Sequence, residues 1–321
     1  MSQETEIVLD RRRLRRRVGL WRALAIVAVA LAIGLLALGG ERALQIGEKR
    51  QIARVSVEGM ITENREQLRL LQRVEEAKHV AGVIVFVNSP GGTTTGGEAL
   101  FEALRKLAGK KPVVAQFGTT AASAGYIVGL GTDHIVARGN TITGSVGVIF
   151  QWPEVSQLLD KLGVRMNEIK SGPLKANPSP FQPIDEPGRK LAEQMIGESK
   201  QWFVGLVASR RGIDTAAIDG LEQGRVFSGR EAVRLKLVDE IGGEAEAVRW
   251  LETKRGVPKN LKVVDWKPKS ELPWSVSGAL ARGIAAAASA LGVPFTLSTG
   301  DAGFGRLSLD GLVSVWQPSE N

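Results

Sequence analysis

Residues 83–92 read VIVFVNSPGG, a run of five apolar residues that leads directly into an asparagine, a serine, a proline and two glycines. A continuous apolar run of this length is typical of a parallel strand that is buried on both faces. Ligands of open α/β sheets bind at the carboxyl ends of such strands, and paired glycines let backbone N–H groups approach a ligand closely. The stretch therefore predicts an α/β fold with a site at residues 88–92, although a plain strand-to-helix turn explains the pentapeptide equally well.

On both sides of this stretch, short β-rich runs alternate with helical patterns. This alternation predicts βαβ units and a mainly parallel sheet that is covered on both faces. Residues 267–321 include an alanine-rich stretch, but they give no clear structural pattern. We expect strands at 52–61, 83–87, 113–117, 135–137, 146–150, 164–169 and 261–266, and helices at 97–110, 121–130, 153–162, 185–211, 228–237 and 244–255.

The composition of the 321-residue chain excludes several classes of site. It contains no cysteine and only two histidines, His79 and His134. A disulfide scaffold, a thiol nucleophile and thiolate metal sites are therefore excluded, and little remains for a histidine-rich metal site or a Ser-His-Asp triad. Apolar residues make up 43% of the chain, which excludes a disordered protein.

Half of the formal net charge of +8 lies in residues 1–22, where seven arginines face three acidic residues. Residues 23–40 follow without a charge, and at about 1.5 Å per residue they span roughly 27 Å, close to the hydrocarbon thickness of a bilayer. Arginines in front of such a run keep the N-terminus in the cytoplasm. We expect a basic cytoplasmic segment at 1–22, a transmembrane anchor at 23–40 and a charged tether at 41–51. A cleaved signal peptide is the alternative, and no nucleic-acid partner is expected.

Two further segments could carry chemistry. Ser123 lies in TTAASAGY, residues 119–126, after a buried strand and at the start of a predicted helix, where its Oγ can project. Close packing of small residues around a merely polar serine explains that segment as well. Lys175 lies in the Gly- and Pro-rich loop SGPLKANPSP, residues 171–180, which could hold one side chain rigidly, although most lysines are solvated surface groups.

A serine nucleophile needs a base, and a neutral lysine is the main alternative to histidine. His79 falls in a charged helical segment and His134 begins a short strand, so both histidines have structural explanations. For a lysine base, the pKa must fall from about 10.4 to near 7, which costs roughly 4 kcal/mol. Ser145, in TGSVGV at residues 143–148, offers a hydroxyl that could orient the amine.

The motifs NSPGG, AASAGY, TGSVGV and SGPLK, in this order behind an apolar N-terminal segment, resemble the short form of the signal peptide peptidase A family. The resemblance covers roughly residues 52–250. It implies a ClpP/crotonase-like fold of repeated β-β-α units, with a mainly parallel sheet and one preceding transmembrane helix. A Ser-Lys peptidase domain at 52–266 and a C-terminal segment of uncertain role at 267–321 follow from it.

The resemblance also implies a role for individual residues. Ser123 matches the nucleophile, Lys175 the general base, and Ser145 the residue that orients the lysine. Gly92 matches the main oxyanion-hole donor, and the related fold makes the N–H of Ala124 a second donor. Ala124 departs from the glycine expected at its position, and its methyl group could narrow the pocket beside the nucleophile.

For the function, the resemblance implies a serine endopeptidase that degrades remnant signal peptides after their release from preproteins. No metal or cofactor is expected. The enzyme would be anchored in the bacterial inner membrane with its catalytic domain on the periplasmic side, and copies of it would form an enclosed ring or dome around apolar peptide substrates. The alternatives are a catalytically silent membrane-tethered scaffold, a crotonase-like acyl-CoA enzyme and a broader membrane-associated peptidase acting on misfolded proteins.

Overall fold

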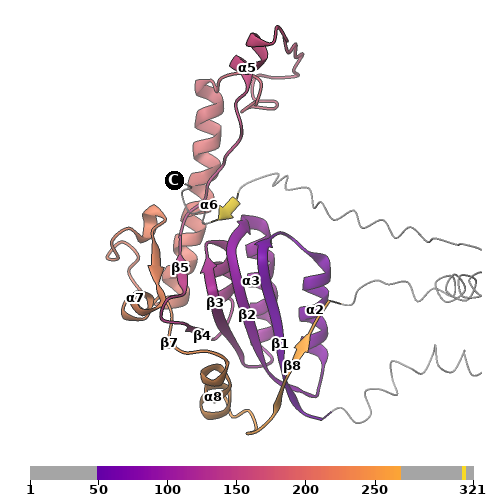
Figure 1. Ribbon diagram of the computed structural model, residues 1–321, viewed down its shortest axis with the longest axis vertical. Coiled ribbons are helices and arrows are strands. Elements are labelled where there is room, and N and C mark those ends of the chain that lie inside the picture. The colour runs from indigo at the N-terminus through magenta and orange to yellow at the C-terminus, as the bar shows by residue number, and fades with distance from the viewer. Residues whose placement is uncertain (1–48, 269–312, 316–321) are drawn as a thin grey trace, which may run out of the picture. The chain divides into compact units, whose positions relative to one another are not determined.

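A computed structural model describes residues 49–268 and 313–315 of the chain (Figure 1). The chain divides into the units Met1–Arg50 and Gln51–Asn321, and every described helix and strand belongs to the second unit. The expected anchor at 23–40 and the alanine-rich stretch at 279–291 lie outside the described residues. Within the described ranges, no helix combines the length and the apolar character that a membrane span requires.

The centre of the fold is a mainly parallel sheet, as the sequence predicts. Its strands follow the order β6-β5-β3-β2-β1-β8, while β4 pairs with β3 and β7, and β9 pairs with β2. Only the β5–β6 and β2–β9 pairs are antiparallel among the described strands. The strands are β1 (Gln51–Ile61), β2 (Val80–Thr93), β3 (Val113–Ala122), β4 (His134–Ala137), β5 (Ile142–Gly144), β6 (Val226–Ser228), β7 (Glu240–Ile241), β8 (Lys262–Trp266) and β9 (Val313–Val315).

The helices begin and end at residues with recognisable capping chemistry. Asn64 caps the first helix by accepting hydrogen bonds from two backbone N–H groups. Asp185 caps the longest of the described helices by accepting a hydrogen bond from the N–H of Gly188, and Gly212, in the left-handed region at φ 63°, ends that helix. The helical segments are α2 (Arg65–Glu76), α3 (Thr94–Ala108), α4 (Ala124–Leu130), α5 (Ser156–Lys161), α6 (Glu186–Arg211), the 3-10 helix η1 (Leu221–Gln223), α7 (Gly229–Arg234) and α8 (Glu244–Lys254).

The two faces of the sheet are covered unequally. On one face, alternate apolar residues of β1, β2 and β3 form a core with α2, α3, α4 and the C-terminal half of α6. On the other face, Ile52, Ile84 and Val114 pack against α8, which covers only the ends of the strands where these residues lie. Further along β1, the residues of this second face are polar. The expected cover on both faces is therefore only partial within the described residues.

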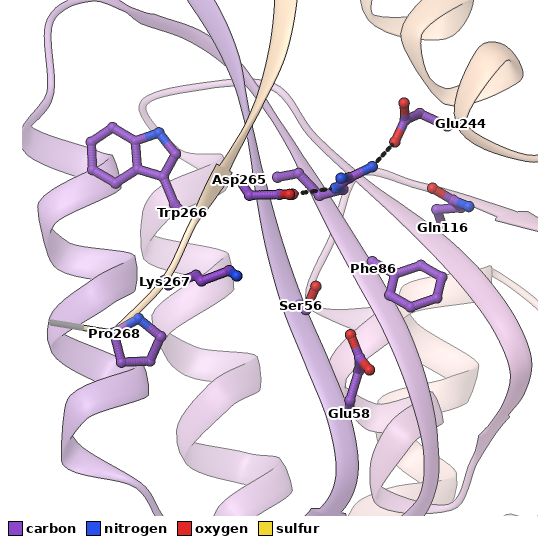
Figure 2. Close-up of a pocket in the computed structure, with 10 residues that line it drawn as sticks. Ser56, Glu58, Phe86, Gln116, Glu244, Asp265, Trp266, Lys267 and Pro268 are labelled. Atoms are coloured by element: carbon purple, nitrogen blue, oxygen red, sulfur yellow. Dashed lines mark hydrogen bonds and ion pairs between the residues drawn. The ribbon is translucent and has the colours of Figure 1, made fainter. Parts of the chain in front are cut away.

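The uncovered part of the second face contains an ion-pair network that holds edge strand β8. Arg54 on β1 donates to Asp265 on β8 at 2.5 Å and to Glu244 at the start of α8. The carboxylates of Asp265 and Glu244 raise the pKa of the Arg54 guanidinium above its ordinary value. A hollow of about 420 Å³ lies beside this network. Figure 2 shows Glu58, Phe86 and Gln116 among the residues that line it. The network joins β1 to β8 and α8. The residues around this hollow therefore have a structural role.

Several predictions of individual strands and helices are wrong. Residues 146–150 and 164–169 are not strands, because the chain leaves the sheet after Gly144. Val164, Met166 and Ile169 are the apolar residues of the second segment, but they are exposed, Ile169 completely. The helix expected at 153–162 is shorter and covers only α5. His79 lies in a turn after α2 rather than within a helical segment.

Glu75 provides a test of the packing between α2 and the end of α3. Its side chain is 5% exposed and forms ion pairs with Lys110 and, at 3.8 Å, with Lys106. The hydrogen bond from Lys110 lowers the pKa of the Glu75 carboxyl below its usual value. Stability from this group is present above the unfolded-state pKa, near 4.3, and is lost as the pH falls through the folded-state pKa.

We therefore expect Glu75→Gln to lower the free energy of unfolding at pH 7, and the difference from wild type to shrink as the pH falls below about 4. Urea denaturation over a series of pH values measures this difference. Glu76→Gln, at an exposed position on the same helix, is the matched control and should change little. A destabilisation by Glu75→Gln that is equal at every pH would contradict the ion-pair explanation.

Candidate active site

Ser123 lies at the junction of β3 and α4 in an unusual backbone conformation. Its φ is 57° and its ψ is −121°, a region that non-glycine residues rarely occupy. The residue is 1% exposed, and its carbonyl oxygen accepts hydrogen bonds from the N–H groups of Tyr126 and Ile127. A strained serine in a sharp strand-to-helix turn is the arrangement of a nucleophile elbow, which projects the side chain out of the turn.

Ser145 is brought next to this turn through its neighbour Gly144. The N–H of Ser123 donates to the carbonyl oxygen of Gly144 at 2.9 Å, and Ser145 follows directly with a φ of 53°. The N–H of Ser145 in turn donates to the carbonyl oxygen of Arg225 at 2.9 Å. A side chain on Gly144 would meet the Phe227 ring at 2.6 Å. The two serines thus lie on adjoining, tightly packed backbone segments.

Residues 88–92, which the sequence predicts as a turn after the strand, lie within the last part of β2 and pair with β1. This segment, the NSPGG turn, is held by hydrogen bonds of Ser89. The Oγ of Ser89 accepts a hydrogen bond from the N–H of Gly91 at 3.1 Å and donates to its carbonyl oxygen at 3.2 Å. Gly91 has a φ of 124°, which favours glycine. A Cβ on Gly92 would lie 1.8 Å from the carbonyl oxygen of Ile61 on β1, so only glycine fits. Sequence reasoning singled out the glycines but missed Ser89, whose buried hydroxyl holds them.

The NSPGG turn and the Ser123 turn lie against each other. Ser89 is the register partner of Ala121 on β3. A Cβ on Gly125 would come within 2.9 Å of the carbonyl oxygen of Ser89, and one on Gly97 would meet the Ala124 methyl group at 3.2 Å. The Ala124 methyl group therefore packs toward α3, and the structure brings the expected nucleophile and both expected oxyanion donors into one region.

Lys175 is not part of this cluster. It is exposed, and its ammonium group makes no hydrogen bond or ion pair within the described part of the chain. Its loop is nevertheless anchored, because the Asn177 amide donates to Asp185, the cap of α6, at 2.6 Å. That hydrogen bond also lowers the pKa of the Asp185 carboxyl. Figure 1 shows α5, which precedes this loop, beyond the N-terminal end of α6 and away from the sheet.

Both histidines lie at the opposite ends of the strands from Ser123. His134 is in register with Val114, near the start of β3, and stacks on Trp250 at 4.8 Å between ring centroids. His79 precedes β2 and stacks on Trp266 at 5.8 Å. Ser123 follows the end of β3, whose ten residues span roughly 33 Å at about 3.3 Å per residue. Neither histidine can therefore act as the base for Ser123 within one copy of the chain.

Two charged residues near Ser145 were not identified as site residues from the sequence. Lys200 on α6 and Glu222 on η1 line a pocket of about 470 Å³ together with Ser145. Lys200 is half-buried there. A lysine on a long amphipathic helix looks like any surface lysine in the sequence, because only the fold shows which helix face meets the turn after β5.

Comparison with known proteins now identifies the family. The model of peptidase family S49 matches residues 105–258, and that of Clp protease matches residues 44–138. A candidate protease of Synechocystis is 36% identical over 65% of this chain and 76% of its own length. A candidate signal peptide peptidase SppA of Enterococcus faecium is 35% identical over 71% of this chain and 70% of its own. The chain belongs to peptidase family S49.

Protease 4 of Haemophilus influenzae, 34% identical, matches 63% of this chain but only 34% of its own length. The present chain is therefore shorter than Protease 4. The matched S49 region includes Ser123, Ser145 and Lys175, while the Clp protease match covers the strands from β1 to β4 and the NSPGG turn. Both matches agree with a peptidase on an α/β, ClpP-like domain.

The backbone conformation of Ser123 leads to a stability prediction. Glycine relieves a strained left-handed conformation, whereas alanine keeps it, so Ser123→Gly should be more stable than Ser123→Ala by roughly 1 kcal/mol. Urea denaturation of both variants measures the difference. At exposed Ser209, within α6, the order should be reversed, because glycine weakens a helix. If alanine were the more stable at both positions, Ser123 would not be strained.

Proposed function

We propose that this S49 peptidase is a Ser-Lys endopeptidase that degrades remnant signal peptides after their release from preproteins. The observation that carries the proposal is the strained, buried turn at Ser123, which lies against the NSPGG segment at Ser89. The name of the Enterococcus faecium relative supports the class of substrate. The distant position of both histidines supports a lysine as the base.

In the proposed reaction, neutral Lys175 removes the proton from the Oγ of Ser123, which attacks the scissile carbonyl carbon of the peptide. The backbone N–H of Gly92 stabilises the oxyanion, with that of Ala124 as a second donor. Lys175 then donates its proton to the leaving amine, and the acyl-enzyme forms. Water, activated by the lysine, releases the acyl group and regenerates Ser123. The hydroxyl of Ser145 orients the lysine amine.

Within one copy of the chain, Lys175 is exposed and apart from Ser123, so we propose that assembly completes the site. The segment around Lys175 carries an unusual number of exposed apolar side chains, which marks a protein interface. Burial in such an interface would also desolvate the ammonium group and favour the neutral amine. The exposed side chains are Leu158, Leu162, Val164, Met166, Ile169, Leu174 and Phe181.

A ring or dome of copies, each presenting Lys175 to the Ser123 of its neighbour, meets both requirements. It places the sites inside an enclosure, where folded proteins cannot reach them. For the location, we propose the bacterial inner membrane, with residues 23–40 as the anchor and the peptidase domain on the periplasmic side. A site held close to the bilayer would meet apolar peptides as they leave it.

A mixing experiment tests whether Lys175 acts on a neighbouring copy. Ser123→Ala and Lys175→Ala should each be inactive alone, and co-expression should restore part of the activity, because some sites then combine an intact serine with an intact lysine. Peptide hydrolysis by purified mixed assemblies measures this. No recovery would mean that serine and lysine act within one copy.

Lys175→Arg gives a second test of the base. Arginine keeps the charge but cannot become a neutral base, so this variant should be as inactive as Lys175→Ala. Lys170→Arg, in the segment before the lysine loop, is the control and should retain activity. Substantial hydrolysis by Lys175→Arg would remove Lys175 from the mechanism.

Digestion of synthetic signal peptides tests the substrate class. The full chain in detergent micelles should cut apolar signal peptides within their hydrophobic segments, whereas Ser123→Ala should not. Mass spectrometry of the products identifies the cut sites. A serine-reactive probe should label the wild type at Ser123. If the probe labelled no residue and no peptide were cut, a catalytically silent scaffold would explain the fold better.

A further inference from the structure

The pocket beside Ser145 contains a lysine that the proposed mechanism does not use. Its walls come from three parts of the chain. The segment after β5 contributes Ser145, Val148 and Ile149, α6 contributes Lys200, and η1 with the residue after it contributes Glu222 and Gly224. The volume of about 470 Å³ is sufficient for one or two amino-acid side chains.

This pocket adjoins the proposed nucleophile. Gly144 accepts the hydrogen bond from the N–H of Ser123, and the next residue, Ser145, lines the pocket. A peptide whose scissile carbonyl lies at Ser123 would therefore have a neighbouring part of its chain within reach of the pocket. Lys200 lines the same pocket as Ser145.

Among the described residues, none forms an ion pair with Lys200. Its ammonium group makes no hydrogen bond or ion pair with any described residue, although the side chain is half-buried. The residues one helical turn away on α6 are Ile196 and Val204, so no carboxylate pairs with it along the helix. An unpaired, partly desolvated cation favours binding of an anionic group.

Glu222 is the other charged residue of the pocket, and it is already engaged. Its carboxylate accepts a hydrogen bond from the Oγ of Thr215 at 2.7 Å. It forms no ion pair with Lys200 within 4 Å among the described residues. In this pocket the ammonium group of Lys200 is available to a ligand and lies beside apolar Val148 and Ile149. The carboxylate of Glu222 is already engaged by Thr215.

We propose that Lys200 binds a carboxylate of the peptide substrate next to the scissile bond. The carboxylate belongs either to an acidic side chain or to the free C-terminus of the peptide. This inference rests on the proposed peptidase function and adds a specificity-determining residue to it. A peptide with such a carboxylate would be held in register with Ser123 by the ion pair at Lys200.

The role of Lys200 differs from that of Lys175 in a way that substitution reveals. Arginine cannot replace a neutral base, but it can bind a carboxylate as well as lysine does. Lys200→Arg should therefore preserve the selection, whereas Lys200→Met should remove it. Lys190→Met, at an exposed position on the same helix, is the matched control and should change nothing.

The experiment compares three versions of one apolar peptide with the full chain in detergent micelles. The first has a C-terminal carboxylate, the second a C-terminal amide, and the third a C-terminal amide with one internal Gln→Glu change. The wild type should prefer a carboxylate-bearing peptide over the plain amide by roughly tenfold in kcat/KM, mainly through a lower KM. Whichever carboxylate gives this preference identifies its source.

Lys200→Met should abolish the preference, so that its kcat/KM for the carboxylate-bearing peptide falls to that for the plain amide. A preference that survives in Lys200→Met would overturn the proposal. So would a loss of hydrolysis of every peptide in both Lys200→Met and Lys200→Arg, because Lys200 would then be needed for the reaction itself. A preference for a lysine-containing peptide that disappears in Glu222→Gln would assign the selection to the opposite charge.

Binding separates this proposal from the peptidase function. In the Ser123→Ala background, fluorescence anisotropy with the same labelled peptides measures Kd without hydrolysis. Tighter binding of a carboxylate peptide, lost on adding Lys200→Met, supports the role of Lys200 even if the wild type cuts none of the peptides. Equal affinity for all three peptides overturns it even if the wild type cuts them all.

Discussion

The proposed site depends on one backbone constraint, the left-handed conformation of Ser123 between a buried strand and a buried helix. The hydrogen bond from its N–H to Gly144 fixes the turn against β5, Gly125 lets the backbone of Ser89 approach it, and Gly97 lets α3 approach Ala124. Strain of this kind persists only where the surrounding structure over-determines it. The turn is therefore rigid because three separate parts of the chain pack against it.

The sequence predicted the parts of this site that depend on local chemistry. Apolar runs such as VIVFV identified the central strands, because a strand buried on both faces has no polar side. The glycines of the NSPGG turn and Ser123 itself were found because they follow such strands directly. Residue patterns also singled out Lys175 and Ser145 as candidates, and the family resemblance assigned their roles as base and orienting residue.

What the sequence could not predict depends on contacts between distant segments. The sequence predicts a strand at 164–169, but these residues pair with no described strand, and their exposed apolar side chains fit an interface better. Lys200 and Glu222 share a pocket only because α6 and η1 meet the segment after β5. Sequence spacing also says nothing of the exposure of Lys175, which one copy of the chain leaves apart from Ser123.

The close contact at Gly92 limits how this peptidase can change. A Cβ there would lie 1.8 Å from a backbone oxygen of Ile61, so every amino acid other than glycine would force β1 and β2 apart. Random mutagenesis should leave this position untouched among active clones, whereas the open walls around Gly224 and Ile149 can accept new side chains. We therefore expect altered substrate preferences to arise from substitutions near η1. The proposed oxyanion donor, Gly92, should stay unchanged.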